Sequence, residues 1–199
     1  MKKKSKVLIG VAALILVAIL AIGATLAYLS DTSGPVTNTF TIGKVKIELK
    51  EHKLDTDGKT LTTGTANEVT SESGYTIIPG TALNKDPFVR VLANSEKCWV
   101  FVKITQTNWN EKLTYAVDTG WAELESAAGT GYKVYYTTVE KATAAQEINI
   151  LKDKKITVAA GLAQTEITDS AKPQLVFDAY AIQFENLSTA AAAWDALSN

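Results

Sequence analysis

The stretch CWVFVKITQ, Cys98–Gln106, decides the fold class of this chain. Apolar and aromatic side chains occupy both parities of the stretch, so both faces of an extended strand would be largely covered. A strand that is covered on both faces reads as a near-continuous apolar run and lies inside a packed sheet. We therefore expect residues 98–106 to form a central β-strand.

A second stretch, LVFDAYAIQF at residues 175–184, has the same character. Its two faces are both largely apolar. This pattern predicts a second central strand.

Shorter extended segments surround these two stretches. Alternating or β-prone residues predict strands at 44–50, 75–78, 88–92, 113–117, 121–124, 132–139 and 156–158, whereas 142–151 fits either a helix or a strand. Turn signals such as Pro79-Gly80 recur about every ten residues, which is typical of sandwiches and barrels. Residues 52–73 are polar and predict a long surface excursion.

The C-terminus has a helical pattern instead. Ser188 is a candidate N-cap, and Trp194 and Leu197 are three residues apart on the face expected to dock. The whole pattern predicts an all-β fold, an antiparallel two-sheet sandwich of the jelly-roll type with a short C-terminal helix.

The N-terminus has the order of a secretory signal. Four lysines precede Val7, and no charged residue occurs from there to Leu29. Thr25 and Ala27 supply the small side chains that a signal peptidase accepts, which predicts cleavage before Tyr28. A membrane anchor is the alternative, because the run is long enough to span a bilayer.

Composition restricts the partners of this chain. Removing residues 1–27 leaves 172 of 199 residues, enough for one domain, and loses four lysines, so the net charge falls from −1 to about −5. Nucleic-acid binding is excluded on this basis, because phosphate contact depends on clustered basic residues. We expect contact with a membrane only through an uncleaved signal peptide.

The residues that most often carry chemistry are few. Cys98 is the only cysteine, so no intramolecular disulfide can form, and its apolar surroundings predict a buried side chain. His52 is the only histidine, and we expect it to be solvated; the two-histidine motif of zinc peptidases is absent. Asp55 and Asp57 resemble the start of a calcium loop without its later ligands. We predict no metal, no cofactor and no enzymatic activity.

The apolar pattern changes phase at Gly43. Val36, Phe40 and Ile42 share one parity, whereas the apolar residues of the next segment, 44–50, share the other. A one-residue change of phase moves side chains to the opposite face of a sheet, so Gly43 is a predicted hinge or bulge. We therefore expect residues 28–43 to be an extended N-terminal segment apart from a β-sandwich domain at 44–199.

Several segments carry a resemblance. Gly23–Thr32 and Asn38–Leu49, with weaker similarity in Ile78–Thr81, Lys85–Pro87 and Phe177–Gln183, resemble the camelysin/TasA-like family of exported Gram-positive proteins. The resemblance implies a jelly roll and a signal that is cut by a SipW-type peptidase. It also implies a location in the extracellular matrix or at the cell surface.

The same resemblance implies a function. The chain would assemble with copies of itself into biofilm-matrix fibres, and residues 28–42 would be a donor strand that completes the sheet of the next subunit through Val36, Phe40 and Ile42. Two alternatives remain at this stage. One is a camelysin-like cell-surface metallopeptidase, and the other is a monomeric surface adhesin or binding module.

Overall fold

The computed structural model describes residues 44–55, 59–71, 75–168 and 171–197. These residues form 11 β-strands and one α-helix. The strands are β1 Ile47–His52, β2 Glu68–Val69, β3 Ala82–Asn84, β4 Phe88–Val91, β5 Cys98–Thr107, β6 Leu113–Thr114, β7 Ala122–Glu123, β8 Tyr132–Val139, β9 Gln146–Asn149, β10 Lys155–Val158 and β11 Gln174–Gln183. The helix is α2 Ala190–Leu197, and single turns of 3₁₀ helix lie at Thr65–Asn67, Glu125–Ala127, Lys152–Lys154 and Gln164–Glu166.

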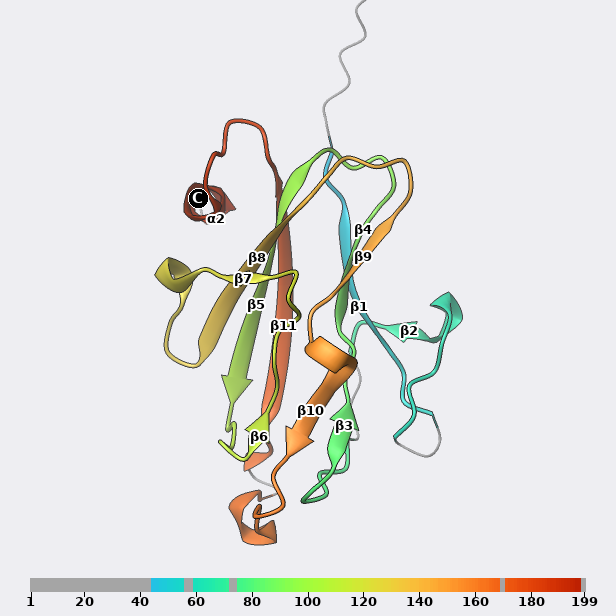
Figure 1. Cartoon of the computed structure of the whole chain (residues 1–199), viewed down its shortest axis with the longest axis vertical. Helices are drawn as coiled ribbons and strands as arrows, with labels where there is room; N and C mark the ends of the chain where they lie inside the picture. The colour runs from blue at the N-terminus through green and yellow to red at the C-terminus, as the bar shows by residue number, and fades with distance from the viewer. Residues whose placement is uncertain (1–43, 56–58, 72–74, 169–170, 198–199) are drawn as a thin grey trace, which may run out of the picture. The chain divides into compact units, whose positions relative to one another are not determined.

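All strand pairs are antiparallel. One sheet has the order β2-β1-β4-β9 and a second has the order β11-β5-β8-β7. Figure 1 shows them as two layers, and the third sheet, β3-β10-β6, lies at one end of both. The predicted all-β sandwich with a C-terminal helix is confirmed, whereas the jelly-roll connectivity stays a prediction.

The central strand is β5, as its sequence predicts. It pairs with β11 over ten residues, from Gln183↔Cys98 to Gln174↔Thr107, and with β8 from Cys98↔Val139 to Thr105↔Tyr132. Both faces of β5 are covered. One face enters the main core, and the other face carries Trp99 and Phe101 into a second cluster beneath α2.

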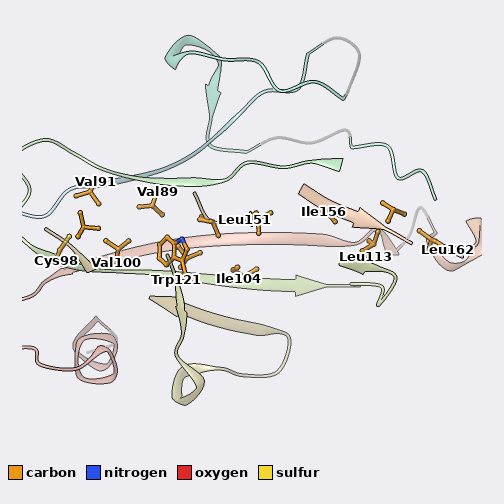
Figure 2. Close-up of a cluster of buried hydrophobic side chains, with 14 residues drawn as sticks. Val89, Val91, Cys98, Val100, Ile104, Leu113, Trp121, Leu151, Ile156 and Leu162 are labelled. Atoms are coloured by element: carbon orange, nitrogen blue, oxygen red, sulfur yellow. The ribbon is translucent and has the colours of Figure 1, made fainter. Parts of the chain in front are cut away.

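The main core fills the space between the two layers. Figure 2 shows side chains from both layers meeting there. Its fully buried members include Val89, Val100, Val102, Ile104 and Ile150. Because the core side chains of β4 and β5 lie at alternate positions along each strand, the period-two pattern of the sequence is the direct source of this part of the core.

The second core cluster fixes the C-terminal helix. Phe101, which is fully buried, lies with its ring centroid 5.3 Å from that of Trp194. Leu197 packs on the same cluster, which confirms the predicted docking face. The predicted cap is wrong by one residue, because the Thr189 hydroxyl, and not that of Ser188, accepts the Ala192 amide hydrogen at 3.2 Å. None of the helices within the described ranges combines the length and hydropathy needed to cross a bilayer.

Several predicted strand positions need correction. Residues 75–78 form no strand, and β3 follows the Pro79-Gly80 turn instead. The ambiguous segment 142–151 contains the strand β9, and the first strand begins at Ile47, three residues later than expected.

The largest correction concerns β11. The sequence predicts a central strand, but β11 pairs only with β5 among the described residues, at the edge of its sheet. An apolar pattern on two faces predicts that a strand will be covered, and it does not specify which neighbour covers it.

Candidate functional site

The free edge of β11 is the most unusual surface of the described domain. None of its ten side chains is buried, although most of them are apolar. Val176 is 45% exposed and Tyr180 is 36% exposed. An edge strand presents unpaired backbone N–H and C=O groups that can pair with another chain, and natural proteins usually shorten or charge such edges.

The two faces of β11 differ in what they contact. Leu175, Phe177, Ala179 and Ala181 point toward the main core and pack against it as partly buried side chains. The other face carries Val176, Asp178 and Tyr180, and the Tyr180 and Trp194 rings are nearly perpendicular, with their centroids 5.4 Å apart. The face with Leu175 and Phe177 therefore adjoins the space between the two layers.

Two adjoining pockets open beside the first half of β11. The larger, about 580 Å³, is lined mainly by apolar side chains, among them Ile77, Leu83, Trp109, Ile156 and Leu175. The smaller, about 200 Å³, is lined by Leu49, Pro87, Leu175, Val176 and Phe177, among others. Ser71, Lys85, Leu175 and Val176 line both pockets, so the two pockets adjoin each other beside this part of β11.

A charged cluster lies on the opposite sheet. Arg90 of β4 donates from Nη1 to Glu68 Oε2 at 2.7 Å and from Nη2 to Glu68 Oε1 at 2.6 Å. Its Nε also donates to Glu147 Oε1 of the edge strand β9 at 3.0 Å. The hydrogen bonds from Arg90 hold the pKa of the Glu68 carboxyl below its usual range, and both carboxylates raise the pKa of Arg90. The cluster ties β2, β4 and β9 together and places charge on the β9 edge.

Two further ion pairs lie where β1 ends. Lys85 Nζ contacts Glu51 Oε2 at 2.5 Å, with both side chains nearly buried and the Tyr75 ring centroid 5.0 Å from Nζ. Asp86, whose side chain is 2% exposed, accepts the His52 backbone N–H at 3.0 Å and lies 2.8 Å from His52 Nδ1. These pairs hold the segment before β4 against the end of β1.

The prediction that His52 is solvated is therefore wrong. Its side chain is 17% exposed, and its ring centroid lies 5.5 Å from that of Phe88. Polar neighbours in the sequence suggested a surface position, but the partner Asp86 is 34 residues away in the chain. Within the described ranges, no three His, Cys, Asp or Glu side chains are grouped as ligands of one metal ion.

Cys98 lies where its sequence context predicts. It is fully buried in the main core, and burial raises the pKa of its thiol to about 11. A thiol with so high a pKa is a poor nucleophile, since the thiolate is the reactive form. Cys98 therefore serves as a small apolar side chain.

The other predicted site residues lie outside the described residues. These are the cleavage residues Thr25, Ala27 and Tyr28, the donor-strand residues Val36, Phe40 and Ile42, the hinge Gly43, and Asp57 of the calcium hypothesis. The domain boundaries at 27 and 43 remain predictions for the same reason. Sequence reasoning missed the pairing roles of Lys85 and Asp86, whose only local signal is a pair of charges directly before Pro87 and a buried strand.

Comparison of the chain with family models, with curated proteins and with solved structures found no match.

Proposed function

We propose that this chain is exported and assembles with copies of itself into extracellular fibres by adding a strand from one subunit to a sheet of the next. The single observation that carries the proposal is a ten-residue apolar strand, β11, with an unpaired edge among the described residues. Exposed edges accept added strands through main-chain hydrogen bonds, and pockets beside the edge receive alternate side chains.

The segment that precedes the described domain has the composition of such a strand. Residues 32–43 carry no charge, and residues 36–42 are rich in Thr with Val36, Phe40 and Ile42. Threonine, β-branched and aromatic residues favour strands. Pro35 and Gly43 border this run, and both residue types mark strand ends. The run therefore supplies a candidate donor of seven residues.

Export is part of the same proposal. The N-terminal apolar run, with Thr25 and Ala27 at its end, supports removal of residues 1–27 by a SipW-type signal peptidase. N-terminal sequencing of the secreted protein should then begin at Tyr28. Protein found only as the full-length chain in membranes would contradict export of this kind.

Electron microscopy of the secreted protein tests the assembly. We expect fibres from the unmodified chain and none, or far fewer, from Phe40→Asp, because a carboxylate cannot enter an apolar pocket without a partner. Burying a Phe side chain contributes about 1.5–3 kcal/mol, so its loss alone should weaken subunit association by roughly tenfold or more.

Thr39→Asp is the matched control. It adds the same charge to the neighbouring residue, whose side chain points to the opposite face of a strand. Fibres from Thr39→Asp but not from Phe40→Asp would support the proposal. A secreted chain that sediments as a monomer at high concentration would refute it and favour the monomeric adhesin.

A further inference from the structure

We propose that the larger pocket beside β11, here named the β11 cavity, binds a small anionic amphiphile: a monocarboxylate with an apolar chain, such as a medium-chain fatty acid. The inference goes beyond the proposed assembly and does not depend on it, because a single subunit carries all the residues of the site. It follows from the volume, the lining and the charges of the cavity.

The β11 cavity has the size and the apolar wall of a ligand site. Its volume is about 580 Å³, and pockets that hold small molecules span roughly 300–1,000 Å³. Nine of its 14 lining residues are apolar, among them Trp109, Leu113 and Ile156. Leu113 and Ile156 lie at one end of the main core in Figure 2. An alkyl chain that enters the cavity is therefore removed from water against core side chains, which is favourable.

The polar part of the lining consists of hydrogen-bond donors. The remaining five residues are Ser71, Tyr75, Lys85, Lys172 and Gln174. Each of them carries an O–H or N–H group, and two of them are cations. No aspartate or glutamate is among the residues that line the cavity. Donors and cations without a carboxylate favour an anionic head group over a cationic one.

Lys85 is the buried member of this polar lining. Its side chain is 9% exposed, and its Nζ atom contacts Glu51 Oε2 at 2.5 Å. Glu51 lines the smaller pocket and is not among the residues that line the β11 cavity. An ammonium group has three N–H donors, so the bond to Glu51 leaves two that can reach another acceptor. Because Glu51 balances the charge of Lys85, the site keeps one net positive charge, that of Lys172, which a single carboxylate matches.

Exposure predicts the orientation of the ligand. Lys172 is exposed, whereas Leu113 and Ile156 are buried, with 3% and 7% of their surface exposed. A carboxylate loses the least hydration when it stays near water and a cation, and an alkyl chain gains the most when it leaves water. The carboxylate should therefore lie toward Lys172 and the chain toward Leu113 and Ile156.

Calorimetric titration tests the head group. Octanoate, octanol and octylammonium, which share one alkyl chain and differ in charge, are each titrated into the monomeric fraction of the purified chain. We expect one octanoate per chain, bound at least roughly tenfold more tightly than octylammonium, because like charges brought together at a binding site are costly. Equal affinity for octanoate and octylammonium, or no binding of octanoate, would overturn the proposal.

A filled cavity tests the location. Ile77 is partly buried and lines the β11 cavity, and Ile78 is 40% exposed and lines neither pocket. Ile77→Trp should lower the affinity for octanoate at least roughly tenfold, because added volume in a packed site excludes the ligand. Ile78→Trp, the matched control, should bind as the unmodified chain does. Equal affinities of the two variants, with folding intact by circular dichroism, would overturn the proposal.

A charge variant tests the role of Lys172. Lys172→Gln should weaken octanoate binding by about threefold, the size expected of an exposed ion pair, and should leave octanol binding unchanged. The matched control is Lys155→Gln, since Lys155 is an exposed residue of β10 next to Ile156 and is outside the lining of the cavity. Equal octanoate affinities of these two variants would overturn the recognition of charge on which the proposal depends.

The inference and the proposed function fail separately. Octanoate binding by a chain that forms no fibres would refute the proposed function and keep the inference. Fibres from a chain that does not bind octanoate in its monomeric fraction would refute the inference and keep the proposed function.

Discussion

Replacing Glu68 by Gln should destabilise the domain by about 2 kcal/mol at neutral pH. Glu68 accepts two short hydrogen bonds from Arg90, and the two side chains are only 7% and 13% exposed. A hydrogen bond to a charged group contributes about 1.5–3 kcal/mol, and a buried charge that loses its partner is costly. Glutamine keeps the shape of the side chain and one acceptor oxygen. The loss of stability should therefore lie in the lower half of the range of about 1.5–3 kcal/mol.

Glu147→Gln is the matched control. Glu147 binds the same arginine with its Oε1 atom 2.5 Å from Nη2, but its side chain is 54% exposed. Exposed ion pairs contribute about 0.2–1 kcal/mol. Each variant removes one carboxylate partner from the same arginine. The difference between their free energies of unfolding therefore measures how much burial strengthens the ion pair.

The stabilisation by the Glu68–Arg90 pair should depend on pH. Arg90 lowers the pKa of Glu68 in the folded protein from an ordinary value of 4.5, so the stabilisation is fully present above that value and is lost as the pH falls through the lowered folded pKa. We would measure the free energy of unfolding in urea by tryptophan fluorescence. The difference in this free energy between wild type and Glu68→Gln should be constant from about pH 6 to 8 and should decrease below about pH 4.5. An equal cost for both variants at pH 7, or a gap that persists at acid pH, would refute this reasoning.

Four further outcomes are expected. Trp194→Ala should cost about 2–3 kcal/mol in urea unfolding, because its ring packs on Phe101 and Tyr180; a cost under 0.5 kcal/mol would mean that α2 does not depend on it. Cys98 should react with a thiol reagent only at the rate of global unfolding, since it is buried with a raised pKa; fast reaction in the native state would contradict this. The secreted chain should not digest casein, and chelator-sensitive digestion with stoichiometric zinc would restore the metallopeptidase alternative. In the proposed assembly, Phe40→Asp disables the donor and Val176→Lys places a charge on the receiving edge of β11. A mixture of the two proteins should therefore form dimers and no fibres in sedimentation, and fibres from the mixture would contradict the proposed pairing with β11.

The sequence predicts the elements of this fold best where a single strand carries enough apolar residues to need cover on both sides. Residues 98–106 satisfy that condition, and β5 is central with both faces packed. Short strands are harder to predict, because a strand such as β3 depends on pairing with β10 across the fold. Tyr75–Ile78 has the β-prone residues of a strand, yet the structure assigns no strand at 75–78, and Ile77 packs against the core from an irregular segment.

The polar contacts could not be predicted, for a related reason. His52 finds Asp86, and Arg90 finds Glu68 and Glu147, across separations of 22 to 57 residues. Periodicity reports which face of a strand a residue occupies, and it carries no information on which distant side chain faces it. These contacts became visible only once the sheet order was known.

The position of β11 also bears on the proposed assembly. In the proposed assembly, the donor segment before β1 and the receiving edge on β11 are different surfaces, so the contact between copies would be heterologous. A heterologous contact closes into a ring only when its rotation happens to close, and otherwise it continues into an open filament. The charges that Arg90 and Glu147 place on the β9 edge disfavour a second, competing contact there. If the chain assembles as proposed, one long apolar edge and one charged edge would therefore favour linear growth in a single direction over closed pairs or sheets.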